Sequence, residues 1–487
     1  MSKDKPQRPK ARLPRGFRDR SGPELASERA MLETIRKVYE SYGFDPLETP
    51  AFEYTDALGK FLPDVDRPNA GVFSLKDDDE QWMSLRYDLT APLARHVAAN
   101  FQHLAKPFRR YATGTVWRNE KPGPGRFREF TQFDADTVGS ASPAADAELL
   151  MMLCDALEAL GLARGSYIVK LNNRKLLDGV LEVAGVALED AARRGIVLRA
   201  IDKLDRLGVQ GVQALLCEGR KDESGDFTKG AGLTQEQAHS VLAFVAPDAK
   251  DEEEHLNQIA HLIRTSTIGA EGLVDLEAIV KILNANGYGP DRVLFDTGVV
   301  RGLDYYTGPV WEAELLFPVK NADGQEVVFG SIASGGRYDD LVARFTGQRV
   351  PAAGISIGVS RLLSALKGHK GALAPLVVIT SFDKSDAGCA LAMAAELRAA
   401  GIRAEAYVGT GKMGDQFKYA DKRGAALAVV EGPDEKAQGV VTVKDLALGA
   451  ELAKGVESRA EWTATRQAQI SVPRADLVAQ VRKLLGG

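Results

Sequence analysis

Residues 110–139 read RYATGTVWRNEKPGPGRFREFTQFDADTVG. The stretch predicts two strands, at 108–118 and 126–138, because the turn-forming sequence NEKPGPG separates two runs whose composition is typical of strands. Arg118 and Arg126 bracket the loop between them. A guanidinium group suits bidentate capture of phosphate or carboxylate. This part of the chain therefore predicts a strand-borne site for an anionic ligand.

Two further segments combine arginines with acids, tyrosines or glycines. The segment 299–312, VVRGLDYYTGPVWE, supplies four such side chains: Arg301, Asp304, Tyr305 and Tyr306. The segment 334–363 begins with SGGRYDD and ends with GISIGVSRLL. Its Gly335 and Gly336 permit close approach of the backbone. Its Arg361 lies at the start of a predicted helix.

An ordinary protein surface offers an alternative explanation for these arginines. Each of them, taken alone, fits pairing with a nearby acid such as Glu48, Glu120 or Asp134. Taken together, strand-borne arginines beside glycines and acids favour a site for a polyphosphate and a small zwitterion. Gln132 and Asp136, four residues apart on the second strand, share a face and can recognise a small molecule rich in donors.

The patterns along the chain predict a division into four regions. Residues 1–175 and 291–370 carry the strand-borne arginines, and residues 176–290 between them read as a helical insertion without a convincing strand rhythm. A linker-like stretch, 368–375, precedes an α/β domain at 376–487. That domain alternates helices with strands at 376–380, 403–408, 426–431 and, as a fourth, 440–446.

Composition narrows the class of protein. The chain has 487 residues, 45% of them hydrophobic, which predicts about three globular domains and excludes wholesale disorder. A net charge of −5 gives no global attraction for nucleic acid, so any such binding needs local basic patches. We expect no membrane span, because no apolar run approaches about 18 residues. Three scattered cysteines favour a reducing, cytoplasmic location.

Two other motifs give weaker alternatives. GTGKMG, at 409–414, matches the GxGxxG pattern of dinucleotide-binding loops and follows a predicted strand. Its position deep in a C-terminal domain and its Lys412 favour a plain strand-to-helix turn. His255 and His261 are six residues apart, a spacing that does not stack them on one helical face as a zinc pair.

The arginine-bearing segments resemble the class II aminoacyl-tRNA synthetases, and specifically the histidyl-tRNA synthetase family. RGLDYYTGPVWE and SGGRYDDLV resemble its two histidine signatures, and RYDLTAPLAR with GRFREFTQFDAD resembles its motif 2 region. GISIGVSRLL resembles motif 3, and YGFDPLETPAFEY resembles motif 1. The resemblance implies an α+β fold: a six-stranded antiparallel sheet flanked by helices, a helical insertion and a C-terminal α/β anticodon-binding domain.

The resemblance also implies a role for each matching residue. Arg118 and Arg301 are the implied catalytic pair around the α-phosphate, with Arg118 also on the substrate carboxylate. The implied histidine-binding residues are Asp88, Thr90, Arg118, Gln132, Asp136, Arg301, Tyr305 and Tyr306. Of these, Asp88, Thr90 and Gln132 would surround the α-ammonium group of the substrate. Asp136 and the Tyr306 hydroxyl would read the two imidazole nitrogens, and Tyr305 would line the pocket. The implied ATP-binding residues are Arg118, Glu120, Arg126, Phe130 and Arg361.

The implied reaction is ligation of L-histidine to tRNA(His), with ATP as substrate and Mg²⁺ bridging its phosphates. A homodimer is implied through motif 1. The alternative is a non-catalytic, histidine-sensing paralogue that acts as regulatory subunit of ATP phosphoribosyltransferase. That class loses the ATP-binding arginines and usually the C-terminal domain, whereas this sequence contains both.

The loop NEKPGPG departs from the family pattern. In bacterial members it commonly reads Arg-Pro-Gln before its glycine, and the glutamine faces the extra guanosine at the 5′ end of tRNA(His). Here Lys121 replaces the arginine and Gly123 the glutamine, while the length between Arg118 and Arg126 is kept. We therefore expect ATP chemistry to be retained and dependence on that guanosine to be weak. The alternative is that Lys121 or the helical insertion restores the contact.

Overall fold

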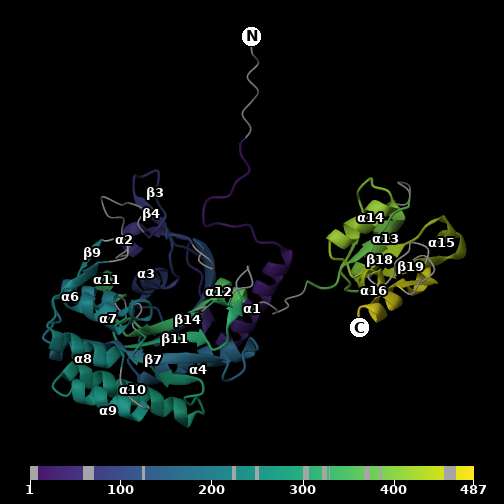
Figure 1. The fold of residues 1–487 in the computed structure, drawn as a ribbon. Coiled ribbons are helices and arrows are strands. Elements are labelled where there is room, and N and C mark those ends of the chain that lie inside the picture. The colour runs from purple at the N-terminus through teal and green to yellow at the C-terminus, as the bar shows by residue number, and fades with distance from the viewer. Residues whose placement is uncertain are drawn as a thin grey trace. The chain divides into compact units, whose positions relative to one another are not determined.

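The computed structural model describes residues 9–58, 71–122, 127–221, 226–246, 252–299, 306–320, 326–327, 330–366, 373–382, 387–453 and 468–486. The chain divides into two compact units (Figure 1). The first comprises Met1–Arg20 and Ser27–His369, and the second comprises Ser21–Ala26 and Lys370–Gly487. No helix among the described residues is long and apolar enough to cross a membrane.

An eight-stranded sheet forms the centre of the first unit. In spatial order its strands are β1 (Asp45–Pro46), β5 (Phe108–Trp117), β6 (Glu129–Val138), β15 (Ala352–Gly358), β14 (Ala333–Arg337), β11 (Pro309–Leu315), β7 (Tyr167–Asn173) and β10 (Val293–Phe295). The six strands from β5 to β7 are antiparallel, and short β1 and β10 add parallel edges. The α+β fold with an antiparallel central sheet is confirmed. The parallel edge strands were not predicted.

One face of this sheet is apolar and covered by helices. Phe133, Trp311 and Ile355 alternate with polar or small neighbours along their strands and are fully buried on this face. Helices α1 (Gly22–Ser41), α4 (Pro143–Ala159), α10 (Thr267–Ala285) and α12 (Val359–Ala365) bury their own apolar residues in the same core. The rings of Tyr39 on α1 and Phe133 lie 5.1 Å apart and edge to face. The apolar residues of alternating strands and of amphipathic helices therefore pack in one core.

The opposite face carries the polar residues and is covered at one end by shorter elements. Helix α3 (Thr90–Asn100) places Leu93 and Val97 against Val138 and Ala352 at that end of the face. A small sheet lies before α3 in the chain, with strands in the order β2 (Phe52–Tyr54), β4 (Trp82–Leu85) and β3 (Ser74–Lys76). The remaining short elements are α2 (Thr55–Leu58), α11 (Ala343–Thr346), β12 (Val319–Lys320) and β13 (Glu326–Val327).

The region predicted as a helical insertion consists mainly of helices. They are α5 (Arg174–Val183), α6 (Ala191–Ile201), α7 (Leu204–Leu216), α8 (Gln235–Val245) and α9 (Glu252–Leu262), followed by α10. Helix α10 packs against α4, α5 and β7 (Figure 1). Sequence patterns predicted no strand here, but β8 (Gly219–Lys221) and β9 (Phe227–Lys229) form a hairpin. Strands of three residues are too short for a periodicity of two to be recognised.

The second unit is a five-stranded mixed sheet with helices. Its strand order is β17 (Ala404–Ala406), β16 (Val377–Ile379), β18 (Leu427–Val430), β19 (Val440–Asp445) and β20 (Gln469–Pro473). The helices are α13 (Ala387–Ala399), α14 (Met413–Lys422), α15 (Pro433–Gln438), α16 (Leu446–Ala453) and α18 (Leu477–Leu484), with a 3-10 turn, η3, at Arg474–Asp476. The four predicted strands are present, and β20 is an additional strand that the sequence patterns missed.

Two glycines of the GTGKMG loop, Gly409 and Gly411, pack against the side chain of Tyr407 in this unit. A Cβ atom on Gly409 would lie 2.4 Å from the Tyr407 hydroxyl oxygen, and one on Gly411 would lie 2.7 Å from it. The Gly411 amide also donates a hydrogen bond to that hydroxyl, at 3.3 Å. The Tyr407 side chain therefore occupies the space that a Cβ at either glycine would take, which favours the strand-to-helix turn over a dinucleotide site.

Candidate active site

The polar face of the central sheet carries a row of hydrogen-bonding side chains along β6. Gln132, Asp134 and Asp136 point to this face, because Phe133 and Ala135 between them are buried in the helical core. All three polar residues are buried. Burial of one amide and two carboxylates lowers the stability of the fold unless hydrogen bonds or opposite charges compensate it. Such groups are typical of binding and catalytic sites.

Small residues on the neighbouring strands make room above this row. Gly354 on β15 pairs with Asp136, and Gly336 on β14 pairs in turn with Gly354. A Cβ on Gly354 would lie 2.1 Å from Asp136 Oδ1, and one on Gly336 would lie 2.8 Å from Tyr306 Cδ1. Asp136 and Tyr306, which come from distant segments, therefore each lie against one glycine of this adjacent pair. Of the two glycines predicted from SGGRYDD, Gly335 faces Trp311 on the other side of the sheet.

Asp136 is held by two partners that the sequence analysis did not select. Its Oδ2 lies 2.7 Å from Arg110 Nη2 on β5, and its Oδ1 accepts a hydrogen bond from the Tyr338 hydroxyl. Burial raises the pKa of Asp136, while Arg110 and Tyr338 act in the opposite direction. Burial also raises the pKa of Tyr306, reinforced by the charges of Asp134 and other acids, so its phenol remains protonated.

Asp88 and Thr90 lie at the start of α3. Asp88 Oδ1 accepts a hydrogen bond from the Ala91 amide at 2.9 Å, which satisfies one exposed donor of the helix N-terminus. Desolvation raises the pKa of Asp88, and this helix contact and the positive charge of Arg118 oppose the rise. Asp88 thus has a structural role in addition to any contact with substrate.

Arg118 directly follows β5, and its side chain contacts a backbone carbonyl and an aromatic ring. Its Nε donates to the Tyr87 carbonyl at 3.1 Å, and its guanidinium carbon lies 5.1 Å from the centre of the Phe130 ring. It forms no ion pair with any described carboxylate, contrary to the ordinary-surface alternative. The Phe130 ring was predicted to stack on adenine. In this structure it makes a cation–π contact with the Arg118 guanidinium.

Gln132 has one satisfied and one unsatisfied end. Its Nε2 donates to the Ser356 hydroxyl at 2.8 Å. Its Oε1 is buried and has no hydrogen-bond partner among the described residues. A buried acceptor without a donor costs about 1–3 kcal/mol, so this oxygen is suited to a donor on a ligand.

The remaining predicted ATP-binding residues lie around the loop after β5 and at α12. The Glu120 carbonyl accepts a hydrogen bond from Arg128 Nε at 2.9 Å, which ties the two sides of that loop together. Arg361 lies in the first turn of α12, directly after β15. Three predicted residues, and the loop glycine, lie outside the described residues: Arg126, Arg301, Tyr305 and Gly123.

Sequence reasoning missed three residues of this face: Arg110, Tyr338 and, above all, Asp134. Asp134 was considered only as a surface partner for an arginine, but it forms no ion pair with a described residue and is 1% exposed. Burial, followed by the charge of Asp136, raises its pKa to about 7. The alternation that places Gln132 and Asp136 on one face includes Asp134 as well, so the signal was present in the sequence.

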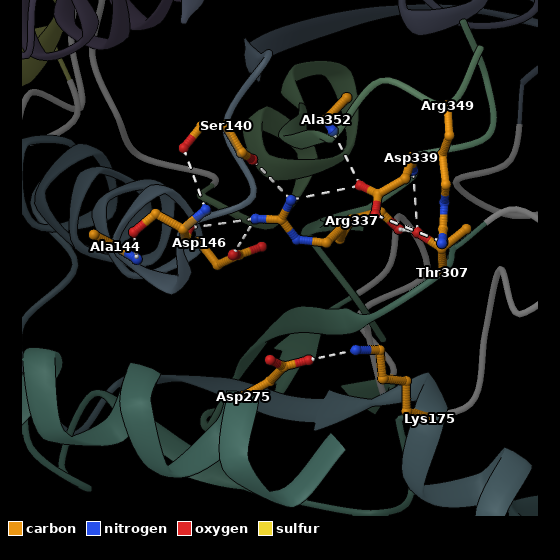
Figure 2. Close-up of polar contacts among 11 residues, drawn as sticks. Ser140, Ala144, Asp146, Lys175, Asp275, Thr307, Arg337, Asp339, Arg349 and Ala352 are labelled. Carbon is orange, nitrogen blue, oxygen red and sulfur yellow. Dashed lines mark hydrogen bonds and ion pairs between the residues drawn. The ribbon is translucent and has the colours of Figure 1, made fainter. Parts of the chain in front are cut away.

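A polar cluster behind the sheet supports the segments that carry Tyr306 and Tyr338. Figure 2 shows Arg337, which follows Gly336, reaching Asp146 of α4 and the Ser140 carbonyl, the latter at 2.9 Å. The Arg337 carbonyl accepts the Thr307 amide at 2.7 Å, and the Asp339 amide donates to the Thr307 hydroxyl at 3.1 Å. These contacts fix the residues that follow each tyrosine.

Two sequence models of known families match the chain. One, described as Histidyl-tRNA synthetase, matches residues 16–362, and the other, described as Anticodon binding domain, matches residues 376–484. The chain belongs to the histidyl-tRNA synthetase family. The first match spans the central sheet with its row of Gln132, Asp134 and Asp136, and the second spans most of the C-terminal sheet and helices.

Relatives of similar length support this assignment. Proteins named histidine--tRNA ligase from Rhizobium leguminosarum bv. trifolii and Cereibacter sphaeroides are each 58% identical. The first alignment covers 99% of this chain and 96% of the relative, and the second covers 100% of both. A crystal structure of histidyl-tRNA synthetase from Nostoc sp. PCC 7120 has a TM-score of 0.71 at 29% identity, covering 98% of this chain and all of that one.

A solved structure from Bacillus halodurans has a similar fold at low sequence identity. It is described as an ATP phosphoribosyltransferase regulatory subunit/histidyl-tRNA synthetase, and it has a TM-score of 0.65 at 21% identity. It covers 85% of this chain and 97% of its own. At that identity the likeness concerns the fold alone.

Proposed function

We propose that the protein is a histidine–tRNA ligase. It activates L-histidine with ATP to histidyl-adenylate and transfers the histidyl group to the 3′ end of tRNA(His). The observation that carries this proposal is that Asp136 and Tyr306, from distant segments, each lie against one glycine of the adjacent pair Gly354 and Gly336. Membership of the histidyl-tRNA synthetase family supports it.

Recognition of the imidazole needs one acceptor and one donor. A neutral imidazole has one nitrogen that donates and one that accepts. In our proposal the Asp136 carboxylate accepts from the first, and the protonated Tyr306 phenol donates to the second. An analogue that lacks either nitrogen leaves a buried polar group unpaired, and such sites discriminate by factors on the order of 10⁴ or more.

Activation is a displacement at the α-phosphorus of ATP. A carboxylate oxygen of histidine attacks, the bond to pyrophosphate breaks, and negative charge increases on the phosphoryl oxygens. Arg118 and Arg301 flank the α-phosphate in this proposal and stabilise that charge, while Arg126 and Arg361 hold the γ-phosphate end. Glu120 and Phe130 bind the adenine, and Thr90 and Asp88 line the amino-acid side. Tyr305 completes the wall of the pocket.

The second step uses tRNA(His) as acceptor. The terminal ribose hydroxyl attacks the carbonyl carbon of the adenylate, and AMP leaves. We propose that the C-terminal unit binds the anticodon, because its residues 376–484 match the anticodon-binding domain model. Mg²⁺ enters with the ATP phosphates as part of that substrate, and the enzyme works as a homodimer in the cytoplasm.

The regulatory-subunit alternative has less support. It predicts loss of the ATP-binding arginines, but the sequence contains all four: Arg118, Arg126, Arg301 and Arg361. It also predicts loss of the C-terminal domain, which is present here at 376–484. We therefore retain the ligase as the proposed function.

Histidine-dependent exchange of radioactive pyrophosphate into ATP tests the first step, and charging of tRNA(His) tests the second. We expect both activities in the purified protein, with no exchange for other amino acids. Asp136→Ala should raise the histidine requirement strongly and leave the ATP requirement almost unchanged. Histidine binding without any exchange would support the regulatory alternative and contradict the proposal.

A further inference from the structure

The N-terminal segment, residues 16–20, lies against the loop that joins β5 to β6. The Gly16 carbonyl accepts a hydrogen bond from the Arg128 amide at 3.0 Å. The guanidinium carbon of Arg18 lies 4.5 Å from the centre of the Phe127 ring, which is a cation–π contact. The segment is therefore held on the part of the loop that leads into β6, beside residues proposed to bind ATP.

The fit between the segment and the loop is close at Gly16. Its φ of +85° lies in the left-handed region, which favours glycine. A Cβ atom there would lie 2.9 Å from Arg128 Cγ and 3.3 Å from Pro122 Cβ. The ring of Phe73 lies 5.9 Å from the Phe17 ring and 5.9 Å from the Arg128 guanidinium carbon. Gly16 and Phe17 therefore support both sides of the loop.

Arg20, at the other end of the segment, binds a buried acid of the first helix. It forms an ion pair with Glu28 on α1, and Glu28 is 7% exposed. The second carboxylate oxygen of Glu28 accepts a hydrogen bond from the Thr131 hydroxyl at 3.0 Å. Arg20 and Glu28 thus connect the N-terminal segment to β6.

Thr131 extends this connection to the helix that carries Arg361. The Thr131 amide donates a hydrogen bond to the Ser360 hydroxyl at 3.0 Å, and both residues are buried. Thr131 follows Phe130 in β6, and Ser360 precedes Arg361 in α12. Buried hydrogen-bond networks hold their members in one arrangement. The ion pair at the far end of this network therefore acts on the positions of two residues proposed to bind ATP.

We propose that the N-terminal segment and Glu28 are positioning elements of the ATP site. Gly16 and Arg18 hold the loop after β5, and Arg20 with Glu28 holds Thr131 and, through it, the start of α12. This inference rests on the proposed function and deepens it. The contacts lead to the loop and to α12 rather than to Asp136, so the KM for ATP should depend on them more than the KM for histidine.

Glu28→Gln tests the connection through Arg20. The glutamine keeps an oxygen for the Thr131 hydroxyl but loses the charge that binds Arg20, which is partly exposed and becomes hydrated. In the pyrophosphate exchange assay the KM for ATP should rise about 10-fold, as loss of a hydrogen bond between charged groups produces. The KM for histidine should be almost unchanged, and Arg20→Lys, which retains the charge, should show a smaller rise than Arg20→Gln.

Glu53→Gln is the matched control. Glu53 is also 7% exposed, and it accepts two hydrogen bonds from Arg95, at 2.9 and 2.8 Å. This pair joins β2 to α3 instead of the N-terminal segment to β6. Because it loses a bidentate ion pair, Glu53→Gln should lower the melting temperature at least as much as Glu28→Gln, but it should keep the wild-type KM for ATP.

Gly16→Ala and Gly43→Ala form a second matched pair, which tests the contact with the loop. The two glycines have φ values of +85° and +78°, so alanine causes similar backbone strain at each. A Cβ on Gly43 meets no atom within 4 Å, whereas one on Gly16 meets Arg128. Gly16→Ala should therefore raise the KM for ATP several-fold, and Gly43→Ala should leave it unchanged.

The outcomes separate this inference from the proposed function. A wild-type KM for ATP in folded Glu28→Gln or Gly16→Ala would overturn the inference and leave the ligase proposal intact. An equal rise in Glu53→Gln, or equal rises for ATP and histidine, would indicate a general loss of stability and would also overturn it. Absence of exchange by the wild-type protein would instead refute the proposed function. The melting temperature of each variant verifies that it is folded in the assay.

Discussion

Replacing Gly354 by alanine should damage histidine recognition through contact with Asp136. The new Cβ would lie 2.1 Å from Asp136 Oδ1, 2.8 Å from its Cγ and 3.1 Å from the Ala135 carbonyl oxygen. Real Cβ atoms essentially never approach closer than 3.0 Å, so the carboxylate must retreat by about 1 Å. That shift disturbs its ion pair with Arg110, now 2.7 Å, and its alignment with the imidazole.

The size of the effect follows from the geometry. Insertion of a methyl group into a filled space costs about 1–3 kcal/mol. A displacement of about 1 Å at reacting or recognising groups can cost about 10²-fold in rate. We therefore expect kcat/KM for histidine to fall about 100-fold, with little change in the KM for ATP, because Gly354 faces Asp136.

Pyrophosphate exchange measured at varied histidine concentration gives kcat/KM for histidine, and the same assay at varied ATP concentration gives the KM for ATP. Gly388→Ala on α13 is the control, because a Cβ there meets no atom within 4 Å. It should match wild type in both. If Gly354→Ala folds and retains the wild-type kcat/KM for histidine, the assignment of Asp136 to the histidine pocket is wrong; an equal loss for both substrates would indicate a general distortion of the sheet.

Four further predictions address other parts of the molecule. Arg301→Ala should lower adenylate formation in the exchange assay by on the order of 10²-fold or more, as loss of a preorganised transition-state charge does, and weaken histidine binding much less; near-normal exchange would reject that role. Deleting residues after 372 should spare histidine activation but abolish most charging of tRNA(His), and normal charging by the truncated enzyme would contradict it. Transcripts with and without the extra 5′ guanosine should be charged within about 100-fold of each other, because Gly123 offers no side chain for a base contact worth roughly 1–3 kcal/mol, and a larger loss without the guanosine would disprove the idea. Finally, the folded-state pKa of Asp134, about 7, exceeds its ordinary value of 3.8, so this carboxyl lowers the stability of wild type as pH rises from about 4 to 7; the gain in melting temperature from Asp134→Asn should accordingly be larger at pH 8 than at pH 5, and an equal gain at both would count against the raised pKa.

Local patterns in the sequence determined most of the elements and the choice of face. The turn sequence NEKPGPG predicted two strands, and the structure has β5 and β6 at Phe108–Trp117 and Glu129–Val138. The periodicity of two placed Gln132 and Asp136 together, because successive side chains of a strand alternate. Resemblance in the signatures then supplied the family and the α+β architecture, which comparison with known proteins confirmed.

The tertiary structure decided which residues meet and which are already satisfied. Pairing of β5 with β6 places Arg110 opposite Asp136, and pairing of β6, β15 and β14 aligns Gly354 and Gly336 across the sheet. Register between strands depends on long-range contacts, so the spacing of residues along the chain cannot reveal it.

The ionisation of the two aspartates on β6 also depends on the tertiary structure. The composition of β6 shows two aspartates, but only the fold gives Asp136 two partners and leaves Asp134 buried with a pKa of about 7. Burial and neighbouring charges set the ionisation of a carboxyl group, and both arise only when distant strands and helices come together.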